Sequence, residues 1–172
     1  EALRVREKLV ADSLNTAMDA NASLLNTNTG LTETVAKGKQ LVIATSTTEA
    51  FRIASNGKMR RTRRASKADG ITACITLAKN RIAATGEETL YVKWIGENGK
   101  PVDAPEQNQA VVGGEQSGFN GKAVVNFQGE AIEVCIDAKR AIDAPVKLES
   151  GIYTLAIMTD SYLVGTVAVE LK

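Results

Sequence analysis

Residues 89–95 read Thr-Leu-Tyr-Val-Lys-Trp-Ile, and this alternation decides the fold class of most of the chain. On an extended strand, every second residue from Leu90 to Trp94 points to one face, and the residues between them point to the other. One apolar face and one mixed face are typical of a strand in an antiparallel sheet that is buried on one side. Trp94 is therefore predicted to anchor a hydrophobic core.

Similar β-rich segments lie on both sides of this strand, and dipeptides such as Asn56-Gly57 and Asn120-Gly121 separate them as predicted turns. The segments are residues 42–53, 71–77, 123–127, 131–137, 152–158 and 163–171. About seven short strands with this spacing predict a mainly β fold, and in particular an immunoglobulin-like antiparallel β-sandwich over residues 41–172. The glycine-rich residues 112–121 lack the Lys-Ser/Thr of a phosphate loop and are predicted to be a flexible loop.

The first 40 residues follow a different period. Apolar residues recur there in alternating steps of three and four, which is typical of an α-helical coiled coil. The predicted oligomerisation seam consists of Leu3, Val10, Leu14, Ala17, Asn21, Leu24, Asn28, Leu31 and Val35. Residues 1–40 are therefore predicted to form a coiled-coil stalk helix about 55 Å long.

Two questions about this helix stay open. Residues 26–30, Asn-Thr-Asn-Thr-Gly, are poor helix formers and could break it, although the heptad register continues through them. The apolar seam could pair with other copies of the chain or pack on the β domain of its own chain. Asn21 and Asn28 would fix register and chain number, and core asparagines resemble those in the stalks of trimeric bacterial adhesins. A homotrimer is expected first and a dimer second.

Cys74 and Cys135 lie in two predicted strands, with Trp94 between them. This order is similar to the Cys-Trp-Cys pattern of immunoglobulin domains, in which a disulfide joins the two sheets. The pattern is incomplete, because Glu133 occupies the position where those domains have a tyrosine. Two interpretations remain open: a disulfide, or two buried reduced cysteines that act as small apolar residues.

Six of the ten residues 58–67 are cationic. They are Lys58, Arg60, Arg61, Arg63, Arg64 and Lys67. One interpretation is a binding site for an anionic ligand. The other is an edge strand that charge protects from aggregation, or an electrostatic partner for the acidic pairs Glu87/Glu88 or Glu130/Glu133. No aromatic residue is interleaved with these cations, which disfavours stacking on nucleic-acid bases.

The composition argues against several classes of function. The chain has no histidine, the commonest general base and metal ligand, so we expect no enzymatic activity, no cofactor and no metal site. The formal net charge of +1 gives no overall attraction to nucleic acid or membranes. No apolar run approaches the roughly 20 residues that a membrane-spanning helix needs.

Several short motifs of the β-rich part resemble a type of Bacteroidota protein in which a coiled coil precedes an immunoglobulin-like β-sandwich. The matching stretches are residues 55–58, 64–71, 74–77, 86–87, 90–92 and 151–165. The resemblance implies this architecture and a cell-envelope or periplasmic context, and it carries no catalytic residue.

The sequence therefore predicts a non-enzymatic structural or scaffold protein. Its coiled coil would oligomerise it, and its β-sandwich would contact an unidentified protein partner. The alternative is a module that binds an anionic polymer or lipid head group through residues 58–67.

Overall fold

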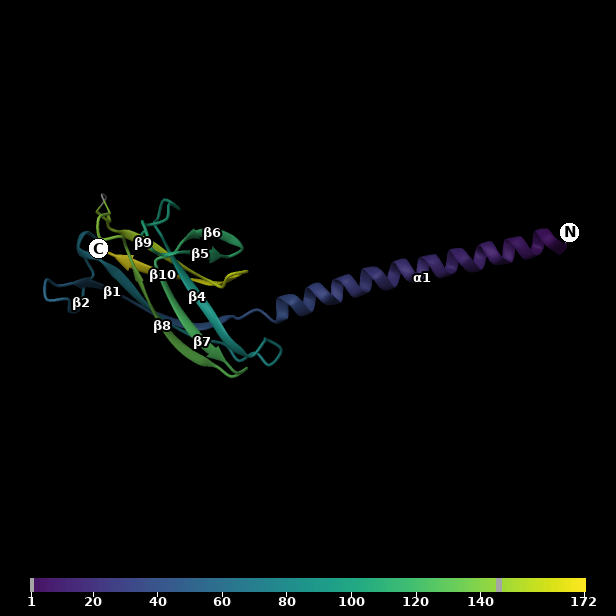
Figure 1. Ribbon diagram of the computed structural model, residues 1–172, viewed down its shortest axis with the longest axis horizontal. Helices are drawn as coiled ribbons and strands as arrows, with labels where there is room; N and C mark the ends of the chain where they lie inside the picture. Colours follow the sequence, from purple (N-terminus) through teal and green to yellow (C-terminus); the bar gives the residue numbers. More distant parts are fainter. Residues whose placement is uncertain (1, 145–146) are drawn as a thin grey trace. The chain divides into compact units, whose positions relative to one another are not determined.

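The computed structural model describes residues 2–144 and 147–172. The chain divides into two compact units, Glu1–Lys39 and Gln40–Lys172. The first is a single α-helix, and the second consists of antiparallel sheets, so the described chain is mainly β (Figure 1). Among the described residues, no helix is long and apolar enough to cross a membrane.

Helix α1 (Ala2–Gly38) is continuous through residues 26–30, so the break that these residues could have caused does not occur. Two threonines in this stretch bond their hydroxyl groups to the helix itself. Thr27 Oγ1 donates to the carbonyl oxygen of Ser23, and Thr29 Oγ1 donates to that of Leu25, both at 2.9 Å. These polar side chains therefore satisfy their hydrogen bonds without leaving the helical conformation.

The second unit contains two four-stranded sheets and a separate hairpin. The first sheet has the order β2 (Met59–Arg61), β1 (Ile43–Ile53), β3 (Gly70–Leu77), β8 (Ile132–Lys139). The second sheet has the order β10 (Leu163–Leu171), β9 (Gly151–Met158), β4 (Gly86–Ile95), β7 (Gly121–Phe127). The hairpin pairs β5 (Gln109–Val112) with β6 (Glu115–Gly118), and one short 3₁₀ helix, η1 (Ala65–Lys67), follows β2.

The strand count differs from the prediction of about seven. The described part of the chain has ten strands, and the additional ones are β2 and the β5–β6 hairpin. The hairpin lies largely within the glycine-rich stretch that was predicted to be a flexible loop. Gly113 and Gly114 have φ angles of 63° and 89°, which side chains disfavour, and they form the tight turn between the two strands.

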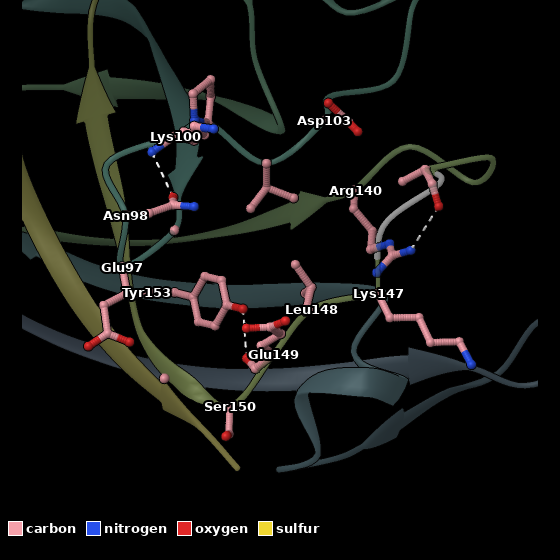
Figure 2. Close-up of a pocket in the computed structure, with 15 residues that line it drawn as sticks. Glu97, Asn98, Lys100, Asp103, Arg140, Lys147, Leu148, Glu149, Ser150 and Tyr153 are labelled. Atoms are coloured by element: carbon pink, nitrogen blue, oxygen red, sulfur yellow. Dashed lines mark hydrogen bonds between the residues drawn. The ribbon is translucent and has the colours of Figure 1, made fainter.

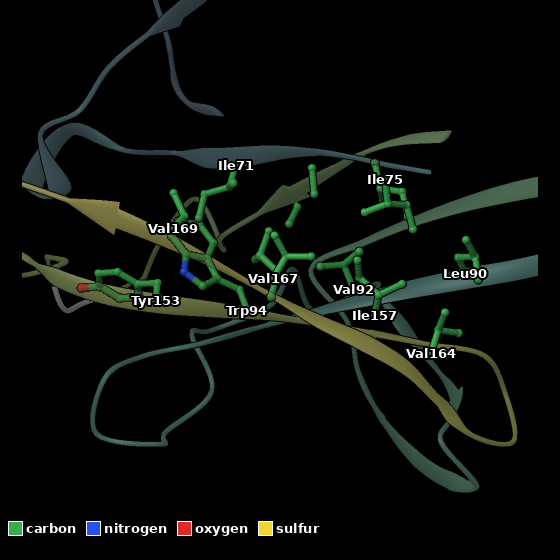
Figure 3. Packing of buried hydrophobic residues seen from close by; sticks show 14 of the residues in the cluster. Ile71, Ile75, Leu90, Val92, Trp94, Tyr153, Ile157, Val164, Val167 and Val169 are labelled. Atoms are coloured by element: carbon green, nitrogen blue, oxygen red, sulfur yellow. The ribbon is translucent and has the colours of Figure 1, made fainter. Parts of the chain in front are cut away.

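Both four-stranded sheets contribute side chains to one hydrophobic core (Figure 3). Leu90, Val92 and Trp94 are fully buried, which confirms the predicted inward face of β4 and the anchoring position of Trp94. The ring of Trp94 meets that of Tyr153 edge-on, with centroids 6.0 Å apart.

Asn120 lies inside the unit and joins three segments. Its Oδ1 accepts the backbone N–H of Trp94 at 2.7 Å, and its Nδ2 donates to the carbonyl oxygens of Lys139 at 3.1 Å and Val102 at 3.3 Å. The Asn120-Gly121 dipeptide separates β6 from β7, as predicted, but Asn120 is buried and the two strands belong to different sheets. Asn56-Gly57, in contrast, forms the predicted hairpin between β1 and β2.

Candidate functional site

The predicted seam of α1 is open to solvent within its own unit. The exposed fractions of its large apolar side chains run from 48% at Val35 to 77% at Leu3, and the helix buries none of its residues. Met18 and Leu25, which directly follow seam positions in the sequence, are also exposed. The apolar stripe is therefore wider than the nine predicted residues, and a single helix offers nothing that could cover it.

The basic segment includes an edge strand, as one of its two interpretations expected, because β2 is the outermost strand of the first sheet. All six predicted cations are exposed. Beyond β2 the backbone is attached to the other sheet: the N–H of Lys172 donates to the carbonyl oxygen of Arg63, and the N–H of Ala65 donates to that of Lys172, both at 2.7 Å. The segment is thus a fixed part of the β unit.

Arg60 and Arg61 are neighbours on β2, but their surroundings differ. The Nε of Arg61 donates to a carboxylate oxygen of Glu49 on β1, and the two side chains form an ion pair. Arg60 lies directly opposite Arg52 in the same ladder. Like charges on facing positions repel, and among the described residues neither Arg52 nor Arg60 has an ion-pair partner. Positive charge is therefore uncompensated at Arg52 and Arg60.

The acidic partners proposed for this segment from sequence are wrong. Glu130 pairs instead with Lys79, whose Nζ lies 2.7 Å from its carboxylate. Burial, with a smaller contribution from the negative charge of Asp160, raises the pKa of Glu88. A neighbouring arginine cluster would lower that pKa instead. The acidic partner in the structure is Glu49, which sequence reasoning missed because only the hairpin register brings it to Arg61.

Cys74 and Cys135 form a disulfide. They are directly opposed in the ladder between β3 and β8, so the bond lies within one sheet. Their neighbours Ile75 and Ile136 point into the core, which places both sulfur atoms on the outer face. Cys135 is exposed and Cys74 is half-buried. The predicted disulfide is confirmed, although it lies within one sheet and does not join two sheets as in immunoglobulin domains. The alternative of two buried thiols is wrong, because the alternation of each strand directs these residues to solvent.

An open cavity of about 570 Å³ lies where residues 96–103 approach residues 140–144 and 147–153 (Figure 2). Charged groups of both signs line it, among them Glu97, Asp103 and Arg140. The hydroxyl of Tyr153 donates to the carbonyl oxygen of Glu149 at 2.7 Å, and burial raises the pKa of Tyr153. No sequence pattern indicated this cavity, because its walls come from segments that are far apart in the chain. The mixed charges favour no single class of ligand.

Comparison with known proteins identifies a family but no relative of known function. No curated protein matches the chain. Among solved structures, the alkylpurine DNA glycosylase AlkC of Pseudomonas fluorescens, bound to DNA containing an abasic site analog, is similar at 12% identity and a TM-score of 0.30. That match covers 60% of this chain and 26% of the glycosylase chain.

The family model described as "Domain of unknown function (DUF8428)" matches residues 44–172. This range begins in β1 and includes every later strand of the β unit. It also contains the basic segment and both cysteines described above. Since the match covers well over half of the sequence, the chain belongs to the DUF8428 family.

Proposed function

We propose that this protein is a non-enzymatic scaffold in which α1 pairs with further copies of itself and each copy presents its β unit to a protein partner. The observation that carries the proposal is the exposed apolar seam on an uninterrupted helix. An isolated helix gains little stability from its own hydrogen bonds and normally depends on burial of an apolar face. Each square ångström of apolar surface removed from water contributes roughly 25 cal/mol.

The polar residues in the seam favour a defined assembly over nonspecific association. Asn21 and Asn28 both lie in the predicted seam. An asparagine buried in a coiled-coil core costs stability, but it fixes the register and the number of chains. We expect a homotrimer first and a homodimer second, in keeping with the resemblance to adhesin stalks.

The β unit is proposed to be immunoglobulin-like. Three features support this. The order β1-β3-β8 facing β10-β9-β4-β7 corresponds to strands A-B-E and G-F-C-C′ of such sandwiches. Trp94 lies on the strand that corresponds to C, and Tyr153, near the start of the strand that corresponds to F, bonds its hydroxyl to the backbone four residues earlier.

We also propose a cell-envelope or periplasmic location, in line with the Bacteroidota resemblance. The Cys74–Cys135 disulfide supports this, because such bonds persist in oxidising compartments.

Leu24→Asp is expected to weaken self-association of the full chain about a hundredfold, because it places a charge in a desolvated seam. The measurement is sedimentation equilibrium over a wide range of protein concentrations. Leu9→Asp is the matched control: Leu9 is exposed to a similar degree, 64% against 60%, but lies off the seam. A wild-type protein that stays monomeric at high concentration, with its helix packed on its own β unit, would contradict the proposal.

A second candidate function is binding of a linear anionic polysaccharide, and the facing pair Arg52 and Arg60 favours it. The double change Arg52→Ser/Arg60→Ser is expected to weaken binding to heparin about tenfold, since each exposed charge contact contributes up to about 1 kcal/mol. Arg61→Ser is the control, because Glu49 already compensates that charge. Affinity is measured by calorimetry at two salt concentrations. Equal losses in both variants, or stronger binding to duplex DNA or anionic vesicles, would argue against this function.

A further inference from the structure

The outer face of the first sheet brings two sulfur atoms and a carboxylate together. The ladder between β3 and β8 places Cys74 opposite Cys135, and on the next outward-facing position it places Thr76 opposite Glu133. One ligand atom from each of Cys74, Glu133 and Cys135 lies within 4.8 Å of the others. These three residues, called the thiol–carboxylate cluster below, are held by the backbone of two paired strands and not by a loop.

The negative charge of Glu133 is uncompensated. Among the described residues Glu133 is exposed and has no ion-pair partner. Asp137 lies on the same face, at the same distance along β8 on the other side of Cys135, but its Oδ1 accepts the hydroxyl of Thr72 at 2.6 Å. The two carboxylates that flank Cys135 therefore differ. Asp137 is hydrogen-bonded to Thr72, whereas Glu133 lies beside the sulfur atoms and is available to bind a ligand.

The disulfide is accessible to a small dithiol, because Cys135 is exposed. A thiolate of the dithiol attacks one sulfur atom and forms a mixed disulfide, and its second thiol then displaces the protein sulfur. Two electrons and two protons pass to the protein, which gains two thiols, and the dithiol becomes a disulfide. The ladder of eight residue pairs from Gly70/Lys139 to Leu77/Ile132 does not depend on this bond, so the two thiols stay opposite each other.

We propose that the reduced thiol–carboxylate cluster binds a zinc-type divalent cation. Zinc takes thiolates at about 2.3 Å and carboxylates at about 2.0–2.2 Å, so ligand atoms around one ion lie within about 4 Å of one another. Rotation of the two cysteine side chains brings the sulfur atoms to that spacing while the strands stay in place. Binding releases the two thiol protons to solvent, and water completes the coordination.

The oxidised protein does not bind the ion, since its sulfur atoms are bonded to each other. The same three side chains therefore alternate between a covalent cross-link and a metal site, and the redox state of the surroundings decides which of the two is present. This inference is independent of the proposed self-association of α1.

The test compares oxidised and dithiol-reduced full-length protein in a zinc titration against a chromophoric chelator, without oxygen. We expect one zinc ion per reduced chain and none per oxidised chain. Glu133→Gln is expected to weaken zinc binding about tenfold, whereas Asp137→Asn leaves it unchanged. Cobalt(II) supplies a second readout, because thiolate ligation produces a charge-transfer absorption that the Cys74→Ser/Cys135→Ser variant would lack.

Three results would overturn the proposal. Reduced wild-type protein could bind zinc no more tightly than the double serine variant. Glu133→Gln and Asp137→Asn could have the same effect, which would exclude Glu133 as a specific ligand. Circular dichroism could show that the reduced protein has lost its β structure, in which case the ladder would no longer hold the ligands together.

Discussion

Trp94→Ala is expected to lower the free energy of unfolding of the β unit by about 3–5 kcal/mol. Trp94 has no exposed surface, and it belongs to a central strand of the second sheet. Its removal takes the edge-on contact from Tyr153 and leaves a cavity between the two sheets. The surrounding strands are held by their ladders and can collapse into that space only in part.

Chemical denaturation followed by far-ultraviolet circular dichroism measures this loss. Ile152→Ala is the matched control, because Ile152 lies on the neighbouring strand β9 with 56% of its surface exposed, and we expect a change within about 0.5 kcal/mol. Trp94→Phe should cost less than Trp94→Ala, because it keeps an aromatic ring and removes an indole N–H that has no hydrogen-bond partner among the described residues. A loss below about 1 kcal/mol for Trp94→Ala would mean that the core does not depend on this residue.

Removing the disulfide with Cys74→Ser/Cys135→Ser is expected to lower the free energy of unfolding by about 4 kcal/mol. The two cysteines are 61 residues apart, and their cross-link restricts the unfolded chain by closing a long loop. Domains of this size are generally stable by about 5–15 kcal/mol, so the variant should still fold. Thermal unfolding with and without a dithiol reductant measures the effect.

The reductant supplies an internal control for this prediction. Wild-type protein should lose stability when it is reduced, and the double serine variant should not respond. If reduction left the unfolding temperature of the wild type unchanged, the cross-link would contribute nothing to the folded β unit. Zinc binding by the reduced protein is a separate measurement, because it requires that β3 and β8 stay paired and does not require the disulfide.

Sequence alternation predicted those strands whose core-facing residues are apolar. The strand at residues 89–95 was predicted correctly because Leu90, Val92 and Trp94 all point into the core. Strand β2 has three exposed residues and no apolar face, so only its position beside β1 makes it a strand. The β5–β6 hairpin was not predicted, because its glycines are typical of a flexible loop. Only the φ angles at Gly113 and Gly114 show that they form an ordered turn.

The functional candidates were predictable as residue types, and their partners were not. The basic segment is visible in the sequence, but the register of the β1–β2 hairpin is needed to place Arg52 opposite Arg60 and Glu49 beside Arg61. The outward position of the disulfide, in contrast, is predictable from the sequence. Cys74 alternates with Ala73 and Ile75, which are fully buried, and that pattern alone directs its sulfur atom away from the core.

Gly121 limits which residues related sequences can carry at the start of β7. A Cβ atom at this position would clash with the carbonyl oxygen of Asp137, and this backbone atom cannot move aside as the end of a flexible side chain can. Family members that retain this contact between β7 and β8 must retain glycine, preceded by a residue that can replace the three hydrogen bonds of Asn120. The Asn-Gly pair can therefore serve as a fixed reference point when distant members are aligned and overall identity is too low to set the register.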